Sequence, residues 1–201
     1  MTLQIKTLAR RSPVSKCLVV IALPLLLVAC GGDDRPLATV DRVDLQRYAG
    51  TWHEIARLPQ WFQRGCYNST ATYSLNDDGS VKVVNRCQRE GDEPSVVQGE
   101  ARVVPGSNNA KLKVRFDNWF SRLLPKVAEG NYWVLALDKD YRTVVIGEPG
   151  REYLWILARQ PRLPEDQYQA LVGVAEEKGF PVQELQRNRD LVPDDESDNT
   201  H

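Results

Sequence analysis

The chain has 201 residues, 42% of them apolar and 26% charged, which suits one folded domain of ordinary composition. Its 26 basic and 27 acidic residues nearly balance, at a formal net charge of −1. The basic residues form no cluster of any size after residue 29, so nucleic-acid binding is excluded as an expected function.

Residues 1–29 are expected to be a signal peptide. Lys6, Arg10, Arg11 and Lys16, with no acid among them, precede the apolar run CLVVIALPLLLVA at residues 17–29. The run is shorter than the roughly 20 residues that span a bilayer, and Pro24 interrupts it, which disfavours a transmembrane helix. The Arg10-Arg11 pair would suit a twin-arginine signal, but the residues after it fit poorly, so ordinary secretion is favoured.

The end of this run indicates lipidation. LVAC, residues 27–30, resembles the bacterial lipobox, which implies that Cys30 becomes the first residue and carries diacylglycerol and a further acyl chain such as palmitate. A chance cysteine at this place is the alternative. Gly31, rather than Asp, follows Cys30, which by resemblance implies sorting to the outer membrane, with the protein anchored at its periplasmic face. Removing the signal takes away four of the 26 basic residues and no acid, leaving a net charge of about −5.

The ends of the chain frame one domain. Residues 30–40 are expected to be the lipidated N-terminus and a polar linker, and residues 191–201 an acidic disordered tail. The domain itself is predicted at residues 41–190.

Short alternating strands dominate this domain. Candidate strands are 52–58, 68–75, 80–87, 96–104, 110–116, 131–138, 142–147 and 152–159, with turn sequences such as NDDG and PGSNN between them. Strands at this spacing predict an antiparallel sandwich or barrel. A helix with an apolar face is predicted from Pro164 to Lys178 and Gly179, packed on the outside of the sheet.

Loop lengths predict which end of a meander is closed. The second, fourth and sixth loops are short, whereas the first, third and fifth are longer, so one end is tight and the other open. If the sheet closes into a barrel, the first and eighth strands become neighbours. Trp52 would then plug the tight end with the Arg159 guanidinium over its face, a contact of about 0.5–2 kcal/mol.

Two cysteines are expected to pair. Cys17 leaves with the signal and Cys30 is lipidated, which leaves Cys66 and Cys87 in an oxidising compartment, so a disulfide is predicted. Cys66 precedes the second strand and Cys87 ends the third, and both are expected at the open end.

Three stretches resemble lipocalin signatures: GTW near the start, LDKDY in the middle and ILAR near the end. The matching residues are Gly50, Trp52, Asp138, Tyr141 and Arg159. Longer stretches such as YAGTWHEIARLP are similar to bacterial outer-membrane lipocalins and apolipoprotein D. His53 departs from the usual tyrosine. The resemblance implies an all-β fold, an eight-stranded antiparallel up-and-down barrel with the C-terminal helix outside.

The resemblance also implies a function, the storage or transport of fatty acids or lysophospholipids for envelope maintenance. An eight-stranded barrel can hold one small apolar ligand. The candidate ligand contacts are aromatic residues of the open end: Trp61, Phe62, Trp119, Phe120 and Tyr132. Only one of Tyr132 and Trp133 can point inward, and by resemblance it is Tyr132.

Two other function classes stay open. An enzyme on this fold could use Glu54 as a buried acid, although hydrogen bonding near the closed end is its favoured role, and His53 is the only histidine before the last residue. A lipoprotein that holds a protein partner could use exposed Trp61 and Phe62. The sequence predicts no catalytic residues, cofactor or metal site, and it leaves the oligomeric state open, a homodimer included.

Overall fold

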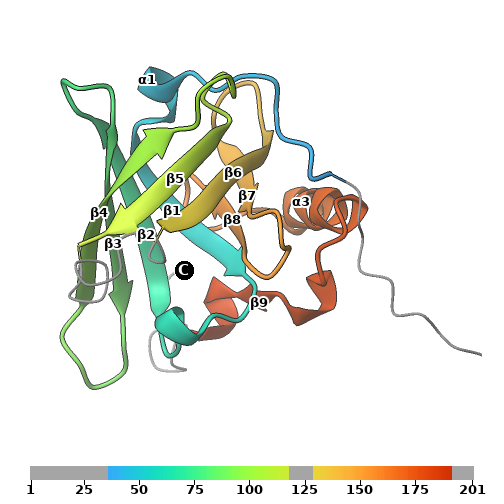
Figure 1. The fold of residues 1–201 in the computed structure, drawn as a ribbon. Coiled ribbons are helices and arrows are strands. Elements are labelled where there is room, and N and C mark those ends of the chain that lie inside the picture. Colours follow the sequence, from blue (N-terminus) through green and yellow to red (C-terminus); the bar gives the residue numbers. More distant parts are fainter. Residues whose placement is uncertain (1–35, 118–128, 192–201) are drawn as a thin grey trace, which may run out of the picture. The chain divides into compact units, whose positions relative to one another are not determined.

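The computed structural model describes residues 36–117 and 129–191, in which eight antiparallel strands form a closed barrel (Figure 1). The strands are β1 (Gly50–Arg57), β2 (Tyr67–Leu75), β3 (Val81–Gln88), β4 (Ser95–Val103), β5 (Lys111–Phe116), β6 (Glu129–Leu137), β7 (Thr143–Gly147) and β8 (Leu154–Ala158). Strands β2 to β8 pair in chain order, and β1 pairs with both β2 and β8. The predicted barrel is confirmed, and every predicted strand boundary lies within two residues of the observed one.

Strand β1 exchanges one of its partners half-way along. Its first half pairs with β2, from Gly50 opposite Tyr73 to His53 opposite Thr70. Beyond that point Ala56 and Arg57 pair with a two-residue strand, β9 (Gln186–Arg187), which the sequence did not predict. The short 3-10 helix η3 (Asn188–Leu191) contacts both β1 and β2. The end of the domain therefore fills the place where these two barrel strands separate.

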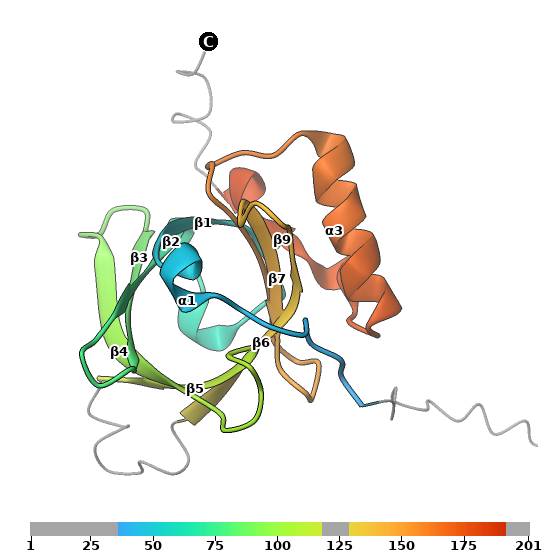
Figure 2. The ribbon, with the colours of Figure 1, turned by 90° about the horizontal axis from the view of Figure 1, so that it is seen from above.

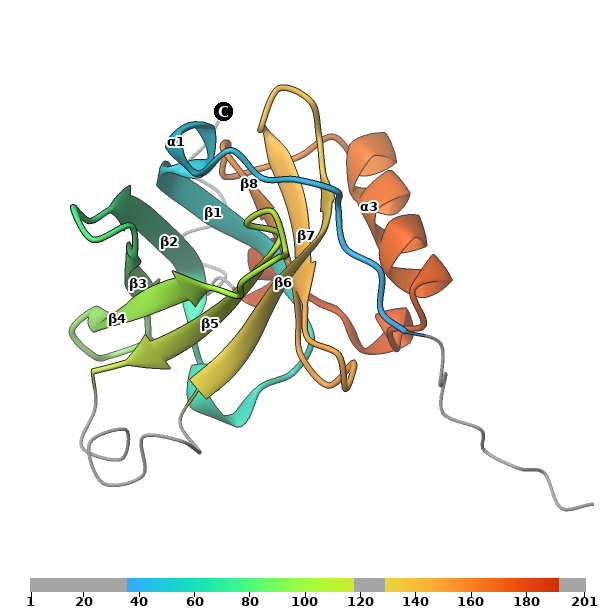
Figure 3. The same cartoon turned by 45° about the horizontal axis from the view of Figure 1, so that its top comes forward.

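The outer face of the barrel carries one helix, α3 (Glu165–Glu177), as predicted (Figure 3). Tyr168 and Ala175 of this helix are buried, and Leu171 and Val172 are partly buried, against an apolar cluster that includes Leu135, Val145 and Ile156. The 3-10 helix η2 (Val182–Glu184) follows it. In the described ranges, no helix is both long and apolar enough to cross a membrane.

A one-turn helix, α1 (Leu45–Tyr48), lies over one end of the ring of strands (Figure 2). Asp44 caps it, because its carboxylate accepts hydrogen bonds from the backbone N–H groups of Gln46 and Arg47 at 3.0 and 3.3 Å. Four residues are too few for a sequence pattern of helical period, so this helix was not predicted. It covers the end of the barrel that the loop lengths predicted to be closed.

Candidate ligand-binding site

Trp52 forms the plug of the closed end. Its side chain is fully buried, and its indole N–H donates to the Tyr48 carbonyl at 2.9 Å. The Arg159 guanidinium carbon lies 3.9 Å from the Trp52 ring centroid, which confirms the predicted cation–π contact. Arg159 also donates hydrogen bonds to the backbone carbonyls of Arg47, Tyr48, Ala49, Thr51 and Tyr141. One side chain thus joins α1, β1 and the loop before β7.

The remaining signature residues support this arrangement. Gly50 has a φ of +98°, and a β-carbon there would lie 3.2 Å from an Arg159 nitrogen, so both conformation and space favour glycine. The Asp138 carboxylate accepts from the backbone N–H of Thr143 at 2.7 Å and of Arg142, which shapes the turn before β7. The Tyr141 hydroxyl accepts from the Asp44 N–H at 2.9 Å.

Three tyrosines form the floor of the barrel interior. The Tyr48 and Tyr132 hydroxyl oxygens are 2.6 Å apart, and Tyr132 donates to the Tyr73 hydroxyl at 2.9 Å. Burial raises the pKa of Tyr73 to about 12 and raises the pKa of Tyr48 and Tyr132 well above 10. The three hydroxyl groups carry three protons, but only two hydrogen bonds join them. One hydroxyl proton therefore has no acceptor among the described residues.

A cavity of about 20 Å³ lies beside these tyrosines. The other residues that line it are Val43, Leu45 of α1, and aliphatic side chains of β3, β4, β5 and β6. Such a volume holds about one water molecule. The cavity beside the tyrosines is therefore too small for an acyl chain.

The predicted inward orientation of Tyr132 is confirmed, but Tyr132 lies deeper in the barrel than predicted. Tyr132 lines the interior, whereas Trp133 packs on the outer apolar cluster with the Lys111 ammonium 4.0 Å from its ring centroid. The sequence analysis placed Tyr132 at the open end because it starts the sixth strand. Strand β6 begins earlier, at Glu129, and Tyr132 reaches Tyr48 of the closing helix instead.

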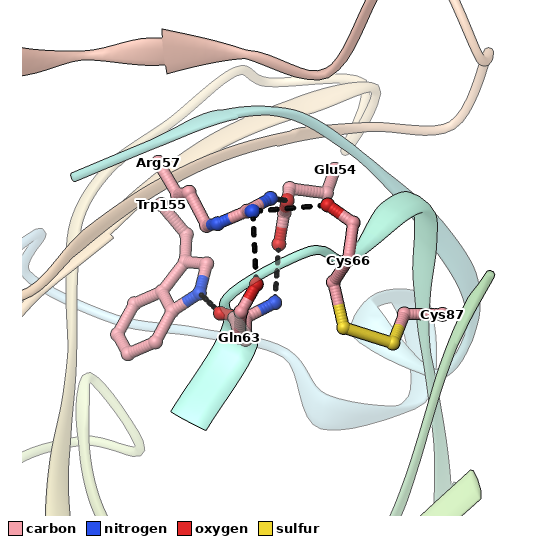
Figure 4. The surroundings of a disulfide bond; sticks show 6 residues. All are labelled: Glu54, Arg57, Gln63, Cys66, Cys87 and Trp155. Atoms are coloured by element: carbon pink, nitrogen blue, oxygen red, sulfur yellow. Dashed lines mark hydrogen bonds and ion pairs between the residues drawn. A yellow bond between two sulfur atoms is a disulfide. The ribbon is translucent and has the colours of Figure 1, made fainter. Parts of the chain in front are cut away.

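A polar cluster lies on the open-end side of the floor, made by Glu54, Arg57, Gln63 and Trp155 (Figure 4). Glu54 and Arg57 form a buried ion pair, with exposed fractions of 3% and 2%. Gln63, from the 3-10 helix η1 (Trp61–Gln63) in the first long loop, donates to Glu54 at 2.9 Å and accepts from the Trp155 indole at 3.0 Å. Glu54 was expected to bond near the closed end; its partners are instead Arg57, at the end of β1, and Gln63 of the loop at the open end.

The disulfide between Cys66 and Cys87 is present, with the two Cα atoms 5.4 Å apart. It joins the end of the first long loop to β3. The Cys66 carbonyl accepts a hydrogen bond from Arg57 at 3.0 Å, so the disulfide and the polar cluster hold the same loop. This confirms the predicted pairing.

The aromatic residues predicted to contact ligand fall into two groups. Trp61 is 78% and Phe62 43% exposed, and Phe62 contacts Tyr153, with ring centroids 5.8 Å apart. Both therefore lie on the rim of the open end. Trp119 and Phe120 lie outside the described residues, as does Cys30. Ligand contact by these side chains and lipidation of Cys30 stay predictions.

Arg57, Gln63 and Trp155 are site residues that the sequence analysis missed. Trp155 could have been found from alternation, because it stands two and four residues before Leu157 and Arg159, whose side chains face inward or close the barrel. Arg57 could not, because a register shift between Glu54 and Ala56 breaks the alternation of β1.

Comparison with known proteins agrees with this geometry. Residues 43–190 match the model of the lipocalin-like domain. The chain belongs to this family. It is 38% identical to outer membrane lipoprotein Blc of Citrobacter freundii over 80% of this chain and 88% of that protein. It is 36% identical to temperature-induced lipocalin-1 of Arabidopsis thaliana over 77% of this chain and 83% of that one.

Solved structures show the same fold at lower identity. Insecticyanin from the tobacco hornworm Manduca sexta matches this lipocalin with a TM-score of 0.59 and 18% identity, over 77% of this chain and 84% of that one. In residues 36–117 and 129–191 of this lipocalin, no three His, Cys, Asp or Glu side chains come together as metal ligands.

Proposed function

We propose that this lipocalin is a lipid-anchored protein of the bacterial outer membrane that binds one acyl lipid in its barrel, a fatty acid or a lysophospholipid. The observation that carries the proposal is the asymmetry of the barrel. One end is sealed by Trp52, Arg159 and α1, and the interior toward the other end has partly buried apolar side chains such as Phe116 and Trp155. A relative of similar length bears the name outer membrane lipoprotein, which supports the location.

The ligand is proposed to enter between the first and fifth loops and to stop at the tyrosine floor. Trp119 and Phe120 of the fifth loop are proposed to line the route. Trp119→Asp should then weaken lipid binding, because it sets a charge against the chain. His53→Ala is a control for position, since His53 lies in the first half of β1, opposite Thr70, and its loss should leave affinity unchanged.

Lipids that co-purify with the protein expressed without residues 1–29 test this function. Extraction and mass spectrometry should find one acyl lipid per barrel, released on unfolding. Protein that carries no lipid and binds none when it is added would contradict the proposal.

A second candidate function rests on the exposure of Trp61 and Phe62. Two large exposed aromatic side chains on one rim suit a contact with a membrane surface or a protein partner. Trp61→Asp should abolish such a contact and leave lipid affinity unchanged if the rim does not touch ligand. Sedimentation with vesicles of outer-membrane phospholipids measures the membrane contact directly.

An enzymatic role has less support. His53 forms no hydrogen bond to a carboxylate or hydroxyl within the described ranges, and Glu54 is held in an ion pair. We therefore propose binding without catalysis.

A further inference from the structure

Glu54 and Arg57 place a complete ion pair inside the barrel. In the β1–β8 register Glu54 lies opposite Leu157 and Arg57 opposite Trp155. Residues that pair directly across two strands point to the same face of the sheet. Leu157 and Trp155 both pack in the interior cluster with Trp52, so the two charged side chains also face the interior.

The carboxylate of Glu54 has a donor on each oxygen. One oxygen is bound by Nη1 of Arg57, and the other accepts from Nε2 of Gln63 at 2.9 Å. Nη2 of Arg57 donates to the carbonyls of Gln63 and Cys66 at 3.2 and 3.0 Å (Figure 4). Nε of Arg57 is buried and has no partner among the described residues. A buried guanidinium with a free N–H is thus held to a carboxylate of the same chain.

This arrangement has a chemical consequence for ligands. A guanidinium inside an apolar barrel would ordinarily bind the carboxylate of an entering ligand, in a charge-assisted hydrogen bond. Here Glu54 already occupies that place, and the pair has no net charge. A ligand carboxylate that took its place would leave Glu54 buried without its counter-ion, with only the hydrogen bond from Gln63, which is strongly unfavourable.

We propose that the Glu54–Arg57 pair determines ligand specificity by keeping ionised groups out of the barrel interior. This inference rests on the proposed lipid-binding function and narrows it. The buried part of the ligand is uncharged, an acyl chain entering by its methyl end or a neutral alcohol or ester, and any ionised head group stays at the rim. Glu54 competes with a ligand carboxylate for Arg57, and Arg57 competes with a ligand amine for Glu54.

Charge variants of the pair test this directly. Wild type, Glu54→Gln, Arg57→Gln and the double variant are titrated at neutral pH with dodecanoic acid, dodecanol and dodecylamine. Glu54→Gln frees the guanidinium and should tighten binding of the acid relative to the alcohol by about tenfold or more, which is about 1.4 kcal/mol. Arg57→Gln should favour the amine in the same way, and the double variant should return to the wild-type ratios.

Glu100→Gln is the matched control. Glu100 pairs with Arg102 on the surface of β4, so its loss changes the net charge equally without altering the interior, and the ratios should not move. Near-ultraviolet circular dichroism checks that each variant is folded. Folded single variants that keep the wild-type acid-to-alcohol and amine-to-alcohol ratios would overturn the inference, because a merely structural ion pair gives no change that follows the sign of the charge.

A measurement on the wild type covers the case in which an unpaired charge prevents folding. The Arg57 Nε–H resonance should shift no more with dodecanoic acid than with dodecanol. A shift specific to the acid would show that Arg57 binds the ligand carboxylate and would overturn the inference. If neither wild type nor any variant binds the three lipids, the proposed function fails as well; binding with unchanged ratios removes only the role of the ion pair.

Discussion

At the scale of single residues, Arg159 connects the segments that close the barrel. It donates to five backbone carbonyls of α1, its C-cap, β1 and the turn before β7, and it covers the Trp52 ring. Arg159→Met should lower the free energy of unfolding by about 2 kcal/mol or more, since charge-assisted hydrogen bonds are lost. Urea unfolding measures it. Arg142→Met, at a side chain that is 76% exposed in the neighbouring turn, should change stability by less than about 0.5 kcal/mol.

The three tyrosines of the floor should make the free energy of unfolding fall as pH rises in the alkaline range. Burial, the main cause, raises the pKa of Tyr73 from 10.0 to about 12, so its proton is retained in the folded state after the unfolded chain has lost it. The stabilisation is complete below pH 10 and is lost as pH rises toward about 12. One such group contributes a slope of about 1.4 kcal/mol per pH unit.

Tyr73→Phe should remove that contribution. Urea unfolding at several values between pH 9 and pH 12 should give a shallower loss of stability for Tyr73→Phe than for wild type. Equal slopes in the two proteins would mean that Tyr73 ionises alike in both states.

At the scale of elements, the first long loop is attached to the barrel in two ways, by the disulfide and by the polar cluster. The disulfide closes a loop with a sequence separation of 21, which stabilises the fold by about 3 kcal/mol in the chain-entropy model. Cys66→Ser with Cys87→Ser should lower the free energy of unfolding by about that amount, measured in urea without reductant. Labelling of both thiols in native, unreduced wild type would instead show that the bridge does not form in the protein.

The strands could be predicted from sequence because each has a recognisable pattern within its own residues. Lys111–Phe116 alternates apolar and polar residues, and a turn sequence precedes it. Strand β9 and helix α1 could not be predicted in this way, because two and four residues carry no period. Their positions depend on contacts with β1 and with Arg159, which are distant in the sequence.

The candidate site was predicted less completely than the fold. The Trp52–Arg159 contact followed from an even number of strands in a closed barrel. Alternation allowed only one of Tyr132 and Trp133 to face inward, and the family resemblance selected Tyr132. The ion pair did not follow from either argument. A register shift in β1 turns Arg57 to the same face as Glu54, and a loop glutamine completes the cluster, and neither feature has a local sequence signal.

At the scale of the whole molecule, the proposed anchor fixes where the barrel works. Cys30→Ser should leave the protein without acyl chains and free in the periplasm, because a single thiol is the proposed attachment point. Mass spectrometry of the mature N-terminus measures whether acyl chains are attached. Cleavage at another residue, or the absence of an acyl mass on wild type, would contradict the anchor.

The central claim is that the barrel takes one acyl chain along its axis, sealed at the tyrosine floor. Titration of delipidated protein with acyl lipids of increasing length tests it most directly. Each added methylene contributes about 0.8 kcal/mol, so affinity should rise roughly fourfold per methylene and then level off when the chain reaches the floor. Affinity that does not depend on chain length would contradict the account.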